Sequence, residues 1–195
     1  VCEYLFTENI DVEEYESVET GLKKYTGKSL LIDVYSTNYT LSTAVDSDKI
    51  HVGISLIPMM KAIKNKVEQD GFRAAMLRDG VAMVKFLAWM KGAVEAGGQT
   101  EITLADRLEA LRAEQQHFKG ISFDTIVGYE AHGAIVHYEA TPETDIPIEP
   151  HGFVLIDSGA QYEDGTTDIT RTIALGELTD ERRRVYTLVL KGHIQ

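Results

Sequence analysis

The sequence predicts an α/β segment followed by a larger α+β domain. Apolar runs typical of buried strands alternate with one helix up to about residue 58. Helical periodicity then dominates, and after Gly120 the chain is rich in β-branched and aromatic residues, which favour strands. We therefore place a domain boundary at Pro58, between residues 1–58 and residues 59–195.

The first segment contains the elements of an α/β pattern. Tyr4–Phe6 is a short apolar run, and Ser29–Tyr35 is continuous and apolar, as expected of a buried strand. Between them, residues 12–24 are predicted to form a helix because four apolar side chains recur at helical spacing: Val12, Tyr15, Val18 and Leu22. None of these elements carries residues that suggest chemistry.

Three helices are predicted next. Residues 59–69 form a short lysine-rich helix that Gly71 breaks, and Phe72–Ala96 form a long helix that ends at Gly97. The long helix has one apolar stripe, which consists of Met83, Leu87, Met90 and Val94. Thr103, followed three residues later by Asp106, is predicted to open the third helix as a capping pair.

The remainder is predicted to form strands and one final helix. The strands are Phe123–Val127, Ala134–Tyr138, Phe153–Tyr162 and Thr167–Leu175. Thr179, followed by two acidic residues, is typical of a helix N-terminus. A sheet normally closes before its domain ends, so we expect the α+β domain to be cut short.

Composition excludes several classes of function. The formal net charge is −12 over 195 residues, which argues against binding to nucleic acid or to an anionic membrane surface. No apolar stretch has the length of a membrane span, and residues 1–4 do not resemble a signal peptide. The only cysteine is Cys2, so the chain cannot form an internal disulfide. A reducing compartment fits this composition, and we predict a cytoplasmic protein. The first residue is not methionine, and we expect the chain to start inside a larger protein.

Asp157 and Asp168 are the candidate metal ligands. Asp157 follows the apolar run 153–156, and a carboxylate inside a buried strand needs a cation, hydrogen-bond donors or a metal. Asp168 lies on the next predicted strand, across a turn that contains Asp164-Gly165, so a hairpin can bring both carboxylates together. Two carboxylates suit a hard cation such as manganese or magnesium.

The residues alone leave two points open. Aspartates near turns usually bind backbone N–H groups, and we assign Asp164 to that role. The strand register is also undecided, because a turn centred on Asp164-Gly165 and a pairing of Asp157 with Asp168 require different turns.

The segment Asp-Ser-Gly-Ala-Gln-Tyr at residues 157–162, followed by Asp-Gly-Thr-Thr-Asp-Ile-Thr-Arg-Thr at 164–172, resembles the metal-binding hairpin of the pita-bread metallopeptidases. Within that superfamily it is similar to the large, three-domain Xaa-Pro aminopeptidases (aminopeptidase P). Shorter matching blocks precede the hairpin: residues 60–65, 71–73, 78–82, 100–101, 122–126 and 133–138. The resemblance is dense from residue 59 and thinner before it.

The resemblance implies a fold, a reaction and a set of site residues. Residues 1–58 would end a creatinase-like non-catalytic domain, and residues 59–195 would begin a pita-bread domain. Asp157 would bind one of two divalent metal ions, manganese by resemblance, and Asp168 would bridge both. His137 would be a catalytic residue that hydrogen-bonds the substrate. The reaction would be hydrolysis of the bond between an N-terminal residue and a following proline, in a protein that is a homodimer at full length.

Departures from the family pattern carry further expectations. The family's remaining ligands, a histidine and two glutamates, would lie beyond Gln195, so the chain alone is expected to be inactive. His132 stands where the family usually has asparagine, which puts in doubt the local hydrogen bond of that asparagine. The alternative function is a catalytically inactive pita-bread protein that binds peptides or partners; creatinase, which works without metal, is a third. Both Asp157 and Asp168 are present, which favours the metallopeptidase.

Overall fold

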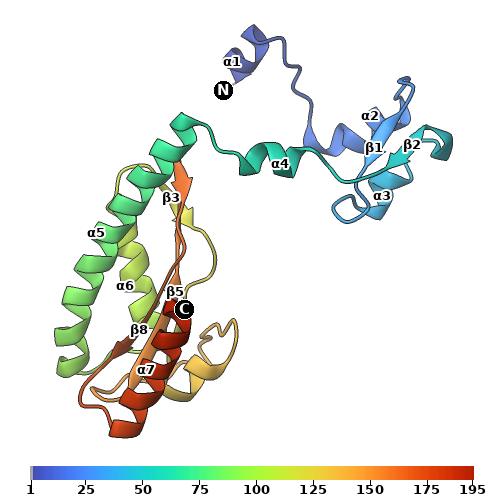
Figure 1. Cartoon of the computed structure of the whole chain (residues 1–195). Helices are drawn as coiled ribbons and strands as arrows, with labels where there is room; N and C mark the ends of the chain where they lie inside the picture. Colours follow the sequence, from blue (N-terminus) through green and yellow to red (C-terminus); the bar gives the residue numbers. More distant parts are fainter. Residues whose placement is uncertain (1) are drawn as a thin grey trace. The chain divides into compact units, whose positions relative to one another are not determined.

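The structure is a computed structural model that describes residues 2–195 (Figure 1). The chain divides into two compact units, Val1–Lys64 and Asn65–Gln195, so the division lies a few residues after the predicted boundary at Pro58. The candidate site residues all belong to the second unit.

The first unit contains short helices and a two-stranded sheet. Strands β1 (Leu30–Ile32) and β2 (Ile50–Val52) pair in parallel, as an α/β pattern requires. The helix predicted over residues 12–24 is shorter in the structure, because a 3-10 turn at Tyr15–Ser17 precedes the α-helix. The apolar run Tyr4–Phe6 lies in a helix. The helices are α1 (Cys2–Thr7), α2 (Val18–Lys23), α3 (Tyr39–Ser42) and α4 (Ile57–Ala62).

The second unit begins with one long helix, α5 (Lys66–Ala96). Asn65 caps it: the Asn65 side chain accepts a hydrogen bond from the Glu68 amide at 3.0 Å, and the Glu68 carboxylate accepts one from the Asn65 amide at 2.8 Å. The prediction that Gly71 breaks the helix is wrong. A Cβ atom at Gly71 would overlap the carbonyl oxygen of Asp164, so glycine allows the helix to approach this turn closely.

Helix α6 (Glu101–Ala113) begins three residues earlier than the predicted capping pair implies. Thr100 is the N-cap, and its hydroxyl accepts from the Thr103 amide at 3.2 Å while the Thr103 hydroxyl accepts from the Thr100 amide at 2.8 Å. The predicted pairing of Thr103 with Asp106 is therefore wrong. This start places Glu101 in the first turn, which matters for the candidate site.

Two three-stranded antiparallel sheets follow, and a final helix, α7 (Asp180–Ile194), ends the unit. One sheet has the order β3-β6-β7, and the other has the order β4-β5-β8. Their strands are β3 (Phe118–Ile121), β6 (Ala160–Tyr162) and β7 (Gly165–Thr166), and β4 (Ile126–Tyr129), β5 (Phe153–Ser158) and β8 (Ile169–Ala174). The predicted α+β class of this unit is confirmed.

The hydrophobic core lies between α5, α6 and the β4-β5-β8 sheet. Alternate residues of β5, Val154 and Ile156, are fully buried against it, so the intervening residues face the other side of the sheet. The helices contribute Ala82, Met83, Phe86, Met90, Val94, Leu104, Leu108 and Leu111. Because this core fixes β5, it also fixes the face on which Asp157 lies.

The predicted strand Ala134–Tyr138 is wrong. Residues Glu130–Ala134 form a 3-10 helix, η3, and the chain then runs without regular structure to His137 and Tyr138. Glu130 and His137 both have positive φ angles, 48° and 56°, which turn the backbone away from an extended path. Residues 130–138 form a loop instead, which we call the histidine loop.

Candidate metal centre

Asp157 lies on the face of β5 opposite the core. It is half-buried, whereas its neighbours Ile156 and Ser158 are fully buried. On the adjacent strand Thr170 pairs directly with Asp157, and the Thr170 hydroxyl donates a hydrogen bond to Asp157 Oδ1 at 2.7 Å. This bond holds one carboxylate oxygen and leaves the other available for a ligand.

Asp168 lies between β7 and β8. The prediction that it lies within a strand is therefore wrong. Its neighbour Thr167 is buried and anchors this stretch: the Thr167 amide donates to the Ala160 carbonyl at 2.9 Å, and the Ala160 amide donates to Thr167 Oγ1 at 2.9 Å. The Ser122 hydroxyl donates to the Thr167 carbonyl at 3.0 Å. Asp168 is thus an exposed side chain on a firmly held backbone.

The register left open by the sequence is decided by the tip of the hairpin. Tyr162 pairs with Gly165, so the two turn residues are Glu163 and Asp164, and Asp157 pairs with Thr170. The assignment of Asp164 to a backbone contact is wrong, because its carboxylate pairs with the guanidinium of Arg78 on α5.

One cavity of about 440 Å³ brings the three predicted site residues together. His137, Asp157 and Asp168 all line it, although they come from the histidine loop, from β5 and from the segment before β8. The other lining residues are Phe123, Asp124, Ile126, Tyr138 and Glu139. The cavity therefore combines carboxylates, one imidazole and an apolar wall.

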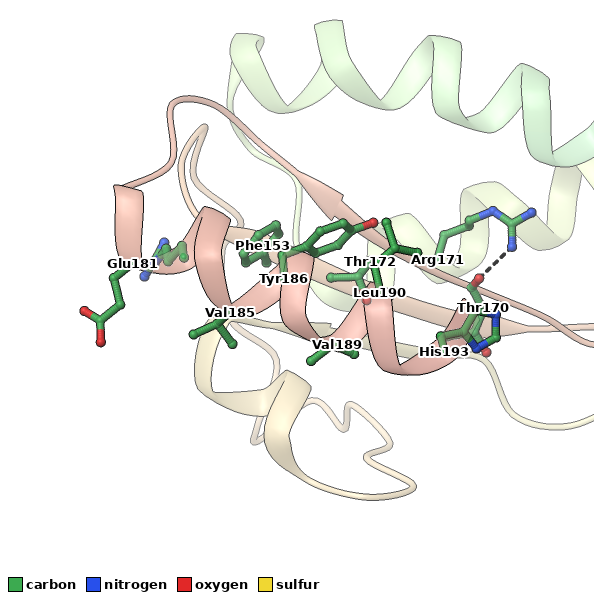
Figure 2. Close-up of a pocket in the computed structure, with 11 residues that line it drawn as sticks. Phe153, Thr170, Arg171, Thr172, Glu181, Val185, Tyr186, Val189, Leu190 and His193 are labelled. Atoms are coloured by element: carbon green, nitrogen blue, oxygen red, sulfur yellow. Dashed lines mark hydrogen bonds between the residues drawn. The ribbon is translucent and has the colours of Figure 1, made fainter. Parts of the chain in front are cut away.

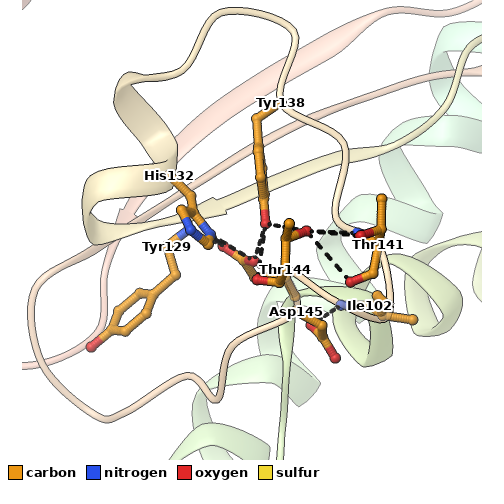
Figure 3. Close-up of polar contacts among 8 residues, drawn as sticks. Ile102, Tyr129, His132, Tyr138, Thr141, Thr144 and Asp145 are labelled. Atoms are coloured by element: carbon orange, nitrogen blue, oxygen red, sulfur yellow. Dashed lines mark hydrogen bonds and ion pairs between the residues drawn. The ribbon is translucent and has the colours of Figure 1, made fainter.

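Figure 3 shows the polar contacts that hold the histidine loop. Their centre is Glu101, whose carboxylate is completely buried in the first turn of α6. It accepts hydrogen bonds from the Tyr129 amide at 2.8 Å and the Tyr138 hydroxyl at 2.8 Å, and it contacts His132 Nδ1 at 3.0 Å. His132 thus has the buried Glu101 carboxylate as its partner. Burial raises the pKa of Tyr138, so its hydroxyl stays a donor at neutral pH.

A second buried network connects the helices to the hairpin. Arg112 on α6 donates from Nε and Nη2 to both carboxylate oxygens of Asp79 on α5, at 2.8 Å and 3.0 Å. The Tyr162 hydroxyl of β6 donates to the same carboxylate at 3.0 Å. Both charged side chains are fully buried, so this network fixes β6 on the helices and, through it, the hairpin that leads to Asp168.

Asp157 and Asp168 fit part of a site for a hard divalent cation. Carboxylate oxygens are the ligands such ions prefer, and the donated bond from Thr170 orients one of them. Among residues 2–195, however, no cluster of three or more histidine, cysteine, aspartate or glutamate side chains has the geometry to hold a metal. The two carboxylates therefore supply part of a coordination shell and not a complete one.

A larger hollow of about 870 Å³ lies between β8 and α7 (Figure 2). Its walls include Phe153, Val185, Tyr186, Val189 and Leu190, and none of the three candidate site residues lines it. Because its lining is mainly apolar and lacks paired carboxylates, we place the chemistry in the smaller cavity.

Sequence reasoning assigned no role to Glu101 or to Thr170. Glu101 belongs to a block, Thr100-Glu101, that carried the resemblance, and Thr170 was expected to share a face with Asp168. Neither pattern reveals the contacts that these side chains make, because their partners are distant in the sequence: Tyr138 for Glu101 and Asp157 for Thr170.

Comparison with known proteins places these features in a class. The fold is that of the pita-bread metallopeptidases and matches solved structures of that fold. A family model described as metallopeptidase family M24 matches residues 70–195, and the chain belongs to this family. A second model, the creatinase/prolidase N-terminal domain, matches residues 1–68.

Individual relatives agree with the predicted subfamily. Aminopeptidase P1 of Arabidopsis thaliana is 38% identical in an alignment that covers 85% of this chain and 29% of the relative. A probable Xaa-Pro aminopeptidase P of Sclerotinia sclerotiorum is 41% identical, with coverage of 93% and 30%. An X-prolyl aminopeptidase from Caenorhabditis elegans, described as a cytosolic enzyme with a di-nuclear active site, superposes with a TM-score of 0.87 at 32% identity and covers 98% of this chain. The resemblance to Xaa-Pro aminopeptidases is confirmed.

The chain spans about a third of the length of these relatives, since it covers 29%, 30% and 33% of them. Within residues 2–195, no helix is both long and apolar enough to cross a membrane.

Proposed function

We propose that the full-length protein containing this chain is a metal-dependent aminopeptidase that hydrolyses the bond between an N-terminal residue and a following proline. The observation that carries the proposal is the single cavity lined by Asp157, Asp168 and His137. Support also comes from relatives that are named Xaa-Pro aminopeptidases. The retained aspartates argue against a metal-free relative and against a binding module without catalysis.

In this proposal Asp157 and Asp168 would be the residues of this chain that hold two divalent metal ions, with manganese as the proposed metal. Thr170 orients Asp157 through its hydrogen bond, and the anchored Thr167 positions Asp168. Bound divalent ions supply a nucleophile from water at neutral pH and polarise the scissile carbonyl. Two carboxylates leave both shells incomplete, so we propose that further ligands come from outside these 195 residues.

His137 is the proposed catalytic donor of this chain. Its ring is exposed in the cavity and is free to hydrogen-bond the substrate. Donation to the carbonyl oxygen would stabilise the charge that develops there as the carbonyl is attacked.

The remaining predictions belong to the same proposal. We propose that residues 1–58 end a non-catalytic domain and that residues 59–195 begin the catalytic one. We also propose a cytoplasmic homodimer; the C. elegans relative is described as cytosolic.

The test is an assay of the full-length protein on two matched peptides that differ only in having proline or alanine at the second position. Cleavage of the first bond should occur only in the proline peptide, disappear after treatment with a chelator, and return with manganese. Equal cleavage of both peptides, or activity that survives removal of the metal, would contradict the proposal.

A further inference from the structure

No polar contact with a described residue holds the ring of His137 in place. Among the described residues, none forms a hydrogen bond or an ion pair with its side chain. Its backbone has a φ of 56°, a conformation that non-glycine residues adopt only where their surroundings impose it. The position of the ring in the cavity therefore depends on what holds the backbone on either side of it.

Glu101 holds the histidine loop at three points. It binds the Tyr129 amide just before the loop, His132 in its middle and the Tyr138 hydroxyl at its end. The His132 and Tyr138 rings also contact each other, with centroids 4.4 Å apart. A buried carboxylate with several donors is strongly bound, because losing any of them leaves charge unsatisfied.

Tyr138 transmits this anchoring to His137, because the two residues are adjacent. The Tyr138 side chain is buried, 7% exposed, while the side chains of Val136 and His137 are exposed. One buried anchor thus fixes the C-terminal side of the left-handed turn, and the bond from the Tyr138 amide to the Ile135 carbonyl at 3.3 Å closes it.

We infer that Glu101 and Tyr138 are positioning residues for His137: the buried carboxylate in α6 sets, through the Tyr138 hydroxyl, where the imidazole stands in the cavity. The inference rests on the proposed function for its catalytic consequence, but the positioning itself can be measured without activity.

Tyr138→Phe in the full-length protein is the main variant. It removes the hydroxyl bond to Glu101 at 2.8 Å, together with the longer contacts of the same hydroxyl with Thr144 at 3.3 Å and 3.4 Å, and it keeps the ring against His132. Tyr129→Phe is the matched control, because it removes another buried tyrosine hydroxyl near the loop while the Tyr129 amide still donates to Glu101. Glu101→Gln tests the carboxylate itself, since an amide of the same shape weakens the bond with the donors.

The kinetic readout is a double-mutant cycle with His137→Ala. Tyr138→Phe should lower kcat about tenfold to a hundredfold, with KM and metal content nearly unchanged. In the His137→Ala background the same substitution should change kcat less than about twofold, because a misplaced imidazole is no longer present. The inference would be overturned if Tyr138→Phe lowered kcat equally in the wild-type and His137→Ala proteins. It would also be overturned if Tyr138→Phe left the wild-type kcat unchanged or caused loss of metal.

The second readout is amide hydrogen exchange of residues 130–138, followed by mass spectrometry. Exchange should be faster in Tyr138→Phe and in Glu101→Gln and unchanged in Tyr129→Phe. Unchanged exchange in all three variants would overturn the inference. If the wild-type protein cleaves no Xaa-Pro peptide but exchange responds as expected, the proposed function fails while the positioning role stands.

Discussion

Thr170 and Asp157 face each other across the β5–β8 ladder, and the Thr170 hydroxyl donates to the Asp157 carboxylate at 2.7 Å. A hydrogen bond of this kind fixes the carboxylate in one orientation before any ligand arrives. It also partly compensates the negative charge of Asp157, which has no positively charged partner among the described residues. The contact therefore gives a direct test of the candidate metal centre.

Thr170→Val should weaken metal binding to the full-length protein about tenfold, because valine keeps the shape of threonine but cannot orient Asp157. Titration calorimetry with manganese measures this. Thr172→Val, two residues along the same strand and opposite Leu155, is the control and should bind like the wild type. Equal affinity of all three proteins would exclude this role for Thr170.

Asp168→Ala should abolish Xaa-Pro cleavage, because the proposed bridging carboxylate serves both metal ions at once. Activity is measured after chelation and restoration with manganese, and metal content by elemental analysis. Glu163→Gln, in the same hairpin but outside the cavity, should stay active. Wild-type turnover in Asp168→Ala would show that the ligand is misassigned.

His137→Ala should lower kcat by roughly two to four orders of magnitude if the imidazole donates to the substrate. Metal content should remain near the wild-type value, because His137 is proposed to act on substrate and not on metal. His51→Ala, an exposed histidine of the first unit, is the control. Loss of both metal ions in His137→Ala would move this residue into the ligand shell.

Asp79→Ala should lower the free energy of unfolding by about 3–5 kcal/mol, because it leaves the buried charge of Arg112 without a partner. Glu114→Ala is a matched control: it breaks the exposed ion pair with Lys85, which joins the same two helices at 3.0 Å. This change should cost at most about 1 kcal/mol. Urea unfolding measures the free energy of unfolding of both variants. Similar losses of stability would contradict the argument that burial makes the Asp79–Arg112 pair the stronger contributor.

Alkaline pH should destabilise the fold through Tyr162. Burial, together with the nearby charge of Asp79, raises the pKa of its hydroxyl above the ordinary value of 10.0. The protonated phenol is thus favoured in the folded state, so its contribution to stability is complete below about pH 10 and falls as pH rises further. Tyr162→Phe should reduce this loss of stability, measured by urea unfolding between pH 9 and pH 11, a range chosen around the ordinary tyrosine pKa. Tyr15→Phe, at an exposed tyrosine, should unfold like the wild type at every pH. An unchanged pH profile in Tyr162→Phe would rule out this tyrosine as the cause.

Local sequence determined the fold class, most of the long helices and the candidate ligands. The apolar stripe of α5 and the alternation in β5 are properties of neighbouring residues, so periodicity reveals them. Asp157 stood out because a carboxylate interrupts an apolar run, and Asp168 because a hairpin can bring it beside Asp157. His137 followed from the resemblance of whole motifs.

Tertiary structure decided what local pattern could not. Gly71 lies inside a helix, where the Asp164 carbonyl approaches it too closely for a Cβ atom. Residues 134–138 lie in a loop in which the Tyr138 hydroxyl binds Glu101, 37 residues earlier in the chain. The strand register was settled by the Glu163-Asp164 turn and by the core that fixes β5. Contacts between residues far apart in the chain outweigh small local preferences, since one buried, charged hydrogen bond exceeds the propensity of several residues. Such contacts become visible only when the chain is folded.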